Sequence, residues 1–487
     1  MLKNIVLILF TASIAFVHIS RAQEETPLIS VIDKYLKAEA ENDLFSGAIL
    51  VAKNGETVYQ GAFGYAQKEG KILNRIDTKF SIGSIGKTFT AVLIMQLVEQ
   101  GKLELTDPIE KYLPDFPYEE KSEIQIQHLL NHTSGLGNYF THVEYQANIP
   151  VIRSISQALE LVYDQKPLFK PGTRYEYSNS GMLVLGAIIE KVTGMSYREY
   201  LKKQILDPVG MANSGIWYPE DRVPNRAIGY SKISEGSHKI ETENEFPALS
   251  DGGLYSTVGD MLKYDLALRE NQLLSQQYKD IMFSVTPPAE KYAYGWEVGT
   301  FKDHDFTGHV GGCPGFSADF IRFQKEQVMI IVLSNYTDGA RVLAAKLHHL
   351  VFGADEDSVP LATEYDYRFR AGRYLSEVKK DYSASIEYFD KNIHGPEPHL
   401  PSLFSAARSR ILGNIEVEKA IELLREYMVL NPGASKGTQA AVWWLSGKGY
   451  EQLNDRDKAI DCFERSLEIK PDFSRAMESL EQITGEE

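Results

Sequence analysis

Two strand-forming segments lie at opposite ends of a long, helix-rich region of this 487-residue chain. The first, SGAILVAKNGETVYQGAFGYA, has β-prone runs on both sides of Asn54-Gly55, a dipeptide that strongly favours a hairpin turn. The second, FSADFIRFQKEQVMIIVLSNY, contains two strands around a polar turn, and residues 328–333 are apolar enough for a buried strand. Together they predict one antiparallel sheet closed by distant parts of the chain, in an α+β domain that ends near Gly353.

The region between these segments is dominated by helical patterns. Residues 88–100 are nearly all good helix formers, and apolar side chains cover most of the circumference, so we expect a helix that is buried on all sides. Residues 181–206 contain two more helices, separated near Gly194. Thr257 begins a capping-box pattern that opens another. These helices would flank the sheet and form a helical region beside it.

The pattern becomes purely helical beyond an acidic segment over residues 354–368, which we expect to be a linker. The stretch AVWWLSGKGYEQLNDRDKAIDCFERSLEIKP spaces its Trp, Gly, Tyr, Ala, Phe and Pro residues as in W-x2-L-G-x2-Y…A-x3-F…P. Ser446 stands where this pattern has Leu. Residues 369–487 therefore resemble a tetratricopeptide-like, all-α helical-repeat domain.

Two weaker copies of this pattern precede the strong one. One contains Ala420 and Leu424, and the fainter one contains Ser385 and Phe389. The spacing between the copies is close to the period of roughly 34 residues expected for such repeats. An unrelated bundle of helical hairpins is the alternative.

The N-terminus has the pattern of a cleavable secretory signal. Lys3 precedes an apolar run over residues 5–17, and small residues stand at the two positions before the cut that a signal peptidase reads, the second being Ala22. An anchoring helix is the alternative, but the run is short for spanning a bilayer. We expect residues 1–22 to be removed, which leaves a domain over residues 23–353 and a periplasmic or secreted protein without a stable membrane anchor.

Charge and cysteine content exclude several classes of protein. The formal net charge of −16 argues against a general nucleic-acid binder, which needs a basic face. The chain has two cysteines, Cys313 and Cys462, which we expect to be free thiols. His128 and His132 are four residues apart and could bind a metal on one helix, but the sequence after His132 resembles a loop, so a structural role is favoured. We expect neither a metal nor an organic cofactor.

The segment FSIGSIGKTFTA allows two interpretations. Gly86-Lys87-Thr88 could end a phosphate-binding loop, but that loop needs a glycine at position 81, where the chain has serine, and a buried strand before it. In the other interpretation, Ser84 is a nucleophile and Lys87, one helical turn further on, takes its proton. The start of a helix also offers backbone N–H groups to an oxyanion. We therefore favour acyl transfer over nucleotide chemistry.

Two further motifs follow Ser84-Ile85-Gly86-Lys87 in the chain. RYEYSNSG supplies Tyr177-Ser178-Asn179, and FTGHVGGCPGFSADF supplies His309-Val310-Gly311-Gly312 on or beside a predicted edge strand. Ser-x-x-Lys, Tyr-x-Asn and His-x-Gly in this order resemble the penicillin-recognising serine hydrolases, and in particular the branch of the class C β-lactamases with its esterases, D-peptidases and D-aminopeptidases. The resemblance spans roughly residues 29–353 and implies a β-lactamase-like fold.

The resemblance implies a role for each catalytic residue. Ser84 would attack a carbonyl and form an acyl-enzyme, and Lys87 would share and orient its proton. Tyr177 would act as a phenolate-like base or pass a proton to the leaving group. A packing role for this tyrosine is the alternative, since the chain contains 27 tyrosines.

Three more residues are expected to bind substrate. Asn179 would bridge Lys87 and a substrate amide, because its side chain both donates and accepts. His309 would present a polar or positive group to the acyl site, and the backbone N–H of Gly312 would be the second oxyanion donor. Class C β-lactamases have Lys-Thr-Gly where this chain has His309-Val310-Gly311, so we expect poor β-lactamase activity.

These observations predict an exported serine hydrolase, of peptidase or esterase type, that cleaves a small-molecule ester, amide or peptide. The helical repeats would bind a protein partner or shape the entrance of the cleft. The alternative is a catalytically silent binding protein that keeps the fold and uses its repeats as an interaction module.

Overall fold

The structure is a computed structural model that describes residues 28–141, 152–218, 221–234, 237–241, 249–353, 368–369, 371–373, 375–393 and 399–485. The expected signal over residues 1–22 lies outside the described residues, as does nearly all of the expected linker. The chain divides into two compact units, residues 1–231 with 240–361, and residues 232–239 with 362–487. Within the described ranges, no helix combines the length and the apolar character that a membrane span requires.

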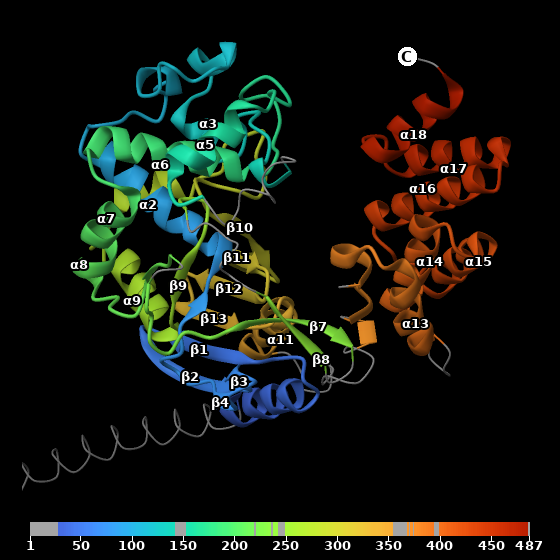
Figure 1. Ribbon diagram of the computed structural model, residues 1–487, viewed down its shortest axis with the longest axis horizontal. Helices are drawn as coiled ribbons and strands as arrows, with labels where there is room; N and C mark the ends of the chain where they lie inside the picture. Colours follow the sequence, from blue (N-terminus) through green and yellow to red (C-terminus); the bar gives the residue numbers. More distant parts are fainter. Residues whose placement is uncertain are drawn as a thin grey trace, which may run out of the picture. The chain divides into compact units, whose positions relative to one another are not determined.

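A six-stranded antiparallel sheet forms the centre of the first unit, in the order β10-β11-β12-β13-β1-β2 (Figure 1). Its strands are β1 (Gly47–Lys53), β2 (Glu56–Phe63), β10 (Glu297–Phe301), β11 (His304–Cys313), β12 (Phe316–Phe323) and β13 (Val328–Ser334). The hairpin predicted at Asn54-Gly55 joins β1 to β2. Strand β1 pairs with β13 along its whole length, with Gly47 opposite Ser334. The prediction that distant segments close one sheet is confirmed.

Both faces of this sheet are covered, which explains why its central strands are continuously apolar. Successive side chains of a strand point to opposite faces. Leu50 of β1 packs with Ile331 of β13 into the core on one side, which includes helix α2 (Gly86–Glu99). Ile49 packs into a second core with α11 (Gly339–Val351) and the helix over residues 28–41.

Helix α2 is buried on all sides, as its sequence predicts. Its residues from Gly86 to Leu97 are all buried. It contacts α6 (Asn179–Thr193) in the helical region beside the sheet. Helix α6 ends at Gly194, whose left-handed conformation stops the helix, and Thr257 caps α9 (Val258–Arg269) with its side chain, as expected.

Smaller elements complete the first unit. Its other α-helices are α3 (Ile126–Leu130), α5 (Ile155–Tyr163), α7 (Tyr197–Leu201), α8 (Asp207–Val209) and α10 (Gln276–Met282). A three-stranded sheet, in the order β5-β9-β6, consists of β5 (Phe80–Ser81), β9 (Leu254–Ser256) and β6 (Gly215–Ile216). A two-stranded sheet pairs β3 (Tyr65–Gln67) with β4 (Ile72–Leu73). Strands β7 (Gly229–Ser234) and β8 (Ser237–Glu241) form another pair, whose residues 232–239 belong to the second unit. The three-stranded sheet leads directly into the helix turn that contains Ser84.

The second unit contains α-helices that pack as successive antiparallel pairs (Figure 1). They are α13 (Tyr382–Ile393), α14 (Leu400–Gly413), α15 (Val417–Leu430), α16 (Lys436–Gln452), α17 (Arg456–Ile469) and α18 (Ser474–Thr484). Close packing between neighbouring helices explains why the repeat pattern requires a glycine. A Cβ on Gly447 of α16 would lie 2.4 Å from the ring of Phe463 on α17, so the glycine lets the two helices approach.

The weaker repeat copies occupy equivalent helices. Phe389 on α13, Leu424 on α15 and Phe463 on α17 are each 0% exposed, and so is the small residue four positions before each of them. Ser446 is buried, and its hydroxyl donates to the carbonyl of Val442 at 3.0 Å, which offsets the cost of burying a polar group there. The all-α repeat architecture is therefore confirmed.

Candidate active site

Ser84 lies in a single 3-10 turn, η1 (Gly83–Ile85), which runs without a break into α2. Gly83 has a φ of +49°, a left-handed conformation that glycine adopts without steric cost. A Cβ at this position would also lie 2.6 Å from the backbone nitrogen of Gly312. No side chain caps this turn. Ser84 therefore stands half-buried at a helix start whose backbone donors face no capping side chain.

Lys87 is 0% exposed and lies next to the serine. Its Nζ donates to Ser84 Oγ at 2.9 Å and also to the carbonyl oxygen of Asp251. Burial disfavours the ammonium form and lowers the pKa of Lys87 to about 8, while the charge of Asp251 opposes this shift. A fraction of this amine is thus neutral near pH 7, as a proton acceptor must be.

Tyr177 comes from the loop before α6 and covers the lysine with its ring. Lys87 Nζ lies 5.1 Å from the centroid of that ring. The ring centroids of His132, Tyr292 and His309 lie 4.4, 6.1 and 6.3 Å from that of Tyr177. The structure thus brings Ser84, Lys87 and Tyr177 together inside an aromatic enclosure.

The protonation of Tyr177 follows from this enclosure. Burial raises the pKa of Tyr177 well above its ordinary value, and a hydrogen bond with Ser84 opposes that shift only in part. The phenol therefore keeps its proton at neutral pH. Of the two roles expected from the sequence, this favours proton transfer to a leaving group over action as a phenolate base.

Asn179 is the first residue of α6 and lines the same cleft as Ser84. Its Nδ2 donates to Asn138 Oδ1 at 3.3 Å. Ser178 caps the helix by accepting from the backbone N–H of Gly181 at 2.9 Å, which fixes the direction of the neighbouring amide. The carbonyl of Asp251 accepts from Lys87, and among the described residues no hydrogen bond joins Lys87 to Asn179 as the sequence had suggested.

His309 lies on β11, buried beneath Tyr177 rather than at the cleft surface. Its Nδ1 is 2.6 Å from the carbonyl oxygen of Val310, and its Nε2 is 2.9 Å from the hydroxyl of Tyr292. This pairing fits a neutral ring that donates from Nδ1 and accepts at Nε2. Burial, together with the charge of Lys87, lowers the pKa of His309 to about 3. Of the two roles expected for His309, a neutral polar group is favoured over a positively charged one.

The two glycines of β11 have different surroundings. A Cβ on Gly311 would lie 1.9 Å from the carbonyl oxygen of Ile82, whereas a Cβ on Gly312 would meet no atom within 4 Å. Gly311 therefore lets the strand approach the turn of Ser84, and Gly312 opens toward the cleft. Among the described residues, strand β10 pairs with β11 only as far as Gly308, so no strand pairs with residues 309–313 on that side.

A cleft with Ser84 on its wall joins these parts. Its lining consists of Ser81, Gly83, Ser84, Phe140, Asn179, Trp217, Arg226, Asp251, Gly252, Gly253, Leu254, Tyr255, Gly312 and Cys313. Tyr177 and His309 are not among these lining residues, although Tyr177 shares a hydrogen bond with Ser84.

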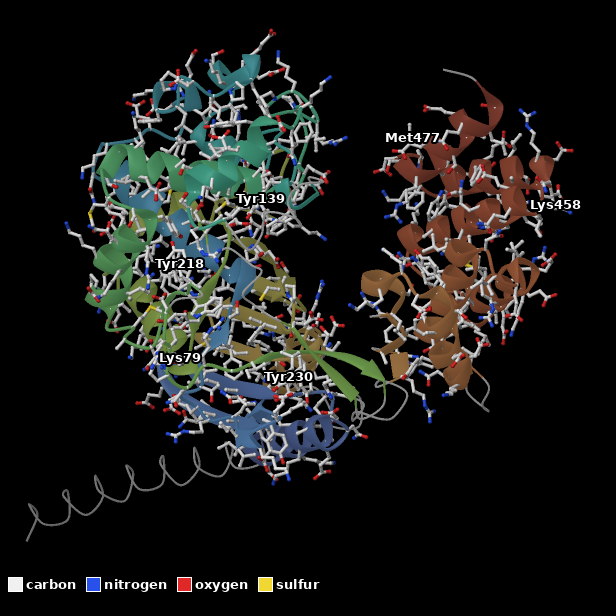
Figure 2. The ribbon with its side chains drawn as sticks, viewed as in Figure 1. Lys79, Tyr139, Tyr218, Tyr230, Lys458 and Met477 are labelled. Atoms are coloured by element: carbon white, nitrogen blue, oxygen red, sulfur yellow. The ribbon has the colours of Figure 1, made fainter. Side chains whose placement is uncertain are left out.

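Sequence reasoning missed Asp251 in this centre, and it favoured a structural role for His132 without linking it to Tyr177. Asp251 supplies the carbonyl that holds Lys87, and its carboxylate accepts from the hydroxyl of Tyr139, which is labelled in Figure 2, at 2.9 Å. The sequence signal for Asp251 is the glycine that follows it. A Cβ on Gly86 would lie 3.1 Å from the Cα of Gly252, so the loop of Asp251 and helix α2 are in close contact. His132 is fully buried and packs on Tyr177.

The two histidines four residues apart do not share a helical face. Helix α3 ends at Leu130, and His132 lies beyond it with a φ of +60°. Within the described ranges, no group of three or more His, Cys, Asp or Glu residues is arranged to hold a metal ion. Both cysteines are free thiols, as expected, and the Sγ of Cys313 is 3.3 Å from Ser81 Oγ at the cleft wall.

An antiparallel sheet covered on both faces, with a serine-containing turn at the edge of its cleft, defines the β-lactamase-like class of serine hydrolases. The Beta-lactamase family model matches residues 30–352, and a tetratricopeptide repeat model matches residues 440–473. The chain therefore belongs to the Beta-lactamase family and is a serine hydrolase with a tetratricopeptide repeat near its C-terminus.

Individual relatives agree with this assignment. Penicillin-binding protein 4* of Bacillus subtilis (strain 168) is 30% identical over 339 residues, which cover 65% of this chain and 74% of that protein. The putative penicillin-binding protein PbpX of the same strain is 34% identical over 318 residues, covering 64% and 75%. The crystal structure of a penicillin-binding protein from Bacillus halodurans superposes with a TM-score of 0.60 at 29% identity, covering 66% of this chain and 98% of that one. The family and fold expected from the sequence are confirmed, while the domain limits and the roles of the six site residues stay predictions.

Proposed function

We propose that this chain is an exported hydrolase that cleaves an ester or amide bond through an acyl-enzyme on Ser84. The observation that carries the proposal is the 2.9 Å contact between Ser84 Oγ and the buried Nζ of Lys87. A serine hydroxyl needs a neighbouring base, and burial provides one by lowering the pKa of Lys87 to about 8.

The remaining residues fit successive steps of such a reaction. Lys87 accepts the proton of Ser84 as Oγ bonds to the substrate carbonyl carbon. The oxyanion receives hydrogen bonds from backbone N–H groups at Ser84 and Gly312. Tyr177, protonated in the free enzyme, passes its proton to the leaving group and regains one from the Lys87 ammonium. Water then attacks the acyl-enzyme carbonyl, the acid leaves, and Ser84 Oγ takes a proton back.

We further propose peptidase or esterase activity in preference to efficient β-lactamase activity. The neutral His309 provides no positive charge at the position where the class C enzymes have lysine. The leader expected over residues 1–22 places the enzyme in the periplasm or outside the cell, and the repeats would hold a protein partner.

The test is a substrate panel of short-chain aryl esters, D-Ala-terminated peptides and a chromogenic cephalosporin, together with labelling by a fluorophosphonate probe. The chain offers a matched control, since Ser376 and Lys379 form a second Ser-x-x-Lys in the other unit. We expect Ser84→Ala to abolish both labelling and turnover, a loss of about 1,000-fold or more, and Ser376→Ala to retain both.

Turnover that persists in Ser84→Ala would remove the proposed nucleophile. Failure of the wild-type protein to label or to turn over any substrate, while a control serine esterase labels, would favour the silent binding protein. Rapid cephalosporin hydrolysis would contradict the proposed preference.

A further inference from the structure

Lys87 changes its charge during the proposed reaction while its side chain stays buried. The proton of Ser84 Oγ moves to Lys87 Nζ as Oγ bonds to the substrate carbonyl carbon, so an ammonium group forms on a residue that is 0% exposed. Burying an ammonium group is costly unless a negative charge lies near it. The reaction therefore needs a counter-charge, which none of the residues in the three sequence motifs provides.

Asp251 is a carboxylic acid in contact with this amine. Its backbone carbonyl accepts from Lys87 Nζ, and the residue is 4% exposed. Among the described residues that line the cleft of Ser84, Asp251 is the only carboxylic acid. Burial lowers the pKa of Lys87, and the charge of Asp251 acts in the opposite direction. One residue thus contacts the base through its backbone and acts on it through its charge.

The carboxylate of Asp251 is held by Tyr139, which is labelled in Figure 2. The hydroxyl of Tyr139 donates to Asp251 Oδ2 at 2.9 Å. The backbone N–H of Tyr139 donates in turn to Ser180 Oγ on α6 at 2.9 Å, which fixes the tyrosine on a neighbouring helix. Burial raises the pKa of Asp251, whereas the charge of Lys87 and the hydroxyl of Tyr139 lower it. Both partners therefore favour the charged form of the acid.

The other ionisable groups packed around Lys87 and Asp251 carry no charge near pH 7. They are His132, His309, Tyr177 and Tyr197. Burial lowers the pKa of both histidines, and the charge of Lys87 lowers it further. Burial raises the pKa of both tyrosines, and the charge of Asp251 adds to that effect. These side chains therefore cannot balance an ammonium group on Lys87.

Glu297 and Arg226 are ionisable side chains of the same region. Glu297 Oε1 lies 3.9 Å from His309 Nδ1, and the Cζ of Arg226 lies 4.0 Å from the centroid of a tryptophan ring on the cleft wall. The charges that shift the pKa values of Lys87 and Asp251 are those of each other. The acid that acts on the base is thus Asp251.

We propose that Asp251 is a positioning residue, whose backbone carbonyl orients the Lys87 amine and whose carboxylate stabilises the ammonium group that forms there. Tyr139 keeps that carboxylate in place. The part resembles that of the buried acid in a Ser-His-Asp triad, which orients the base and stabilises its charged form without taking up the proton. This inference rests on the proposed function, because it concerns the base of the same reaction.

Asp251→Asn tests the charge by itself. The variant keeps the backbone carbonyl, and its side-chain oxygen still accepts from Tyr139, so the negative charge is what is lost. Without that charge the ammonium is less stable, and we expect the midpoint of the pH profile of kcat/KM for a neutral aryl ester to fall by about one pH unit or more. We also expect kcat/KM on the plateau above the midpoint to fall about 10-fold or more, because a weaker base accepts the proton of Ser84 less readily.

The direction of the shift distinguishes this role from a structural one. A variant that loosened the site would let water reach Lys87, and its midpoint would rise toward the ordinary lysine value of about 10.4. Asp251→Ser removes the same charge with a smaller side chain and should shift the midpoint downward as well, so the test does not depend on the folding of one variant. A midpoint that stays unchanged or rises in both variants would overturn the inference.

Asp107→Asn is the matched control. Asp107 is a buried acid of the same unit that accepts from the hydroxyl of Tyr112 at 2.6 Å, and it is not among the residues that line the cleft. We expect this control to keep the wild-type midpoint. A fall in the control equal to that in Asp251→Asn would show that the effect is not specific to Asp251, and would also overturn the inference.

A direct titration of Lys87 separates this inference from the proposed catalysis. In protein with isotope-labelled lysine, the Lys87 signal is assigned by its loss in Lys87→Met, and its titration is followed by NMR without turnover. A lower midpoint in Asp251→Asn supports the counter-charge even where the wild-type protein hydrolyses nothing, an outcome that would remove the proposed function alone. Hydrolysis abolished by Ser84→Ala, with the Lys87 midpoint unchanged in Asp251→Asn, would remove the role of Asp251 alone.

Discussion

Lys87, Tyr177 and His309 are ionisable side chains that burial affects in different ways. Burial lowers the pKa of Lys87 to about 8 and that of His309 to about 3, and it raises the pKa of Tyr177 well above its ordinary value. Both rings therefore stay neutral across the physiological range. Lys87 is the group of the three that titrates near neutrality, which makes it the candidate for the pH-dependent base.

The pH dependence of hydrolysis should follow Lys87. The active form has a neutral amine, and the folded pKa is about 8, so the amine is protonated and inactive below that pH and neutral above it. We expect kcat/KM for a neutral aryl ester to rise about tenfold per pH unit below the pKa and to level off above it. Stopped-time assays between pH 6 and 9.5, corrected with Ser84→Ala for spontaneous hydrolysis, measure this. A flat profile, or one that falls with pH, would contradict Lys87 as the base.

At the scale of elements, the catalytic turn depends on close contact between η1 and β11. Three glycines allow it. Gly83 provides a left-handed conformation, Gly311 lets the carbonyl of Ile82 approach, and Gly312 leaves space in front of Ser84. Since that strand and that turn are more than 200 residues apart in the chain, the site exists only when the sheet is complete.

Alanine substitutions at Gly311 and Gly312 should differ in their effect on stability, because only Gly311 is packed against another segment. Gly311→Ala places a methyl group 1.9 Å from the carbonyl oxygen of Ile82, so we expect a loss of about 2 kcal/mol or more in the free energy of unfolding. Gly312→Ala meets no atom within 4 Å, so we expect a change of less than about 1 kcal/mol. Urea unfolding of both variants measures the difference. Equal destabilisation would show that the contact with Ile82 is not what requires Gly311.

Much of this site could be predicted because each motif is short and contiguous. Ser84 and Lys87 are one helical turn apart, and Tyr177 and Asn179 are two residues apart, so local spacing identified both pairs. Asp251 could not be found in that way, because it meets Lys87 through a backbone carbonyl, and any residue type has one. The spacing of residues within a motif also does not reveal that His309 is neutral, because the neutral state results from burial by rings that come from other segments.

The fold was predictable to a similar extent. The continuous apolar run of β13 and the turn at Asn54-Gly55 identified four strands. The segment of His309 was predicted on or beside an edge strand, but β11 is followed in the sheet by the short β10, which was missed. Its residues, EVGTF, are mostly half-buried and alternate weakly, because β10 is an outer strand of the sheet. Its pairing with β11 ends at Gly308, and this decides where β11 becomes free to face the catalytic turn.

At the scale of the whole molecule, the chain consists of two units with separate cores. Every residue that lines the cleft lies between Ser81 and Cys313, within the first unit. The buried residues of the repeats, which include a cluster from Phe389 to Leu445 and Phe463 on α17, all lie within the second unit. The proposed chemistry and the proposed partner binding therefore belong to different parts of the chain.

A fragment of residues 23–361 should fold and hydrolyse small esters without the repeats. We expect its kcat/KM for a neutral aryl ester to lie within about twofold of that of the longer protein, because a domain with its own core folds alone. Calorimetry should resolve two unfolding transitions in the longer protein and one in the fragment. The Ser84→Ala fragment is the control for activity. A fragment that aggregates, or that folds but loses ester hydrolysis, would show that the repeats contribute to the catalytic unit.

The pairing of β1 with β13 has a consequence for biogenesis. Gly47 meets Ser334, so the hairpin of β1 and β2 leaves the ribosome with an open hydrogen-bonding edge long before its partner strand has been made. The nucleophile can be assembled only after that partner arrives. On the proposed export route, a chain that crosses the cytoplasm unfolded would therefore be inactive, and hydrolysis would begin only after the chain has folded outside.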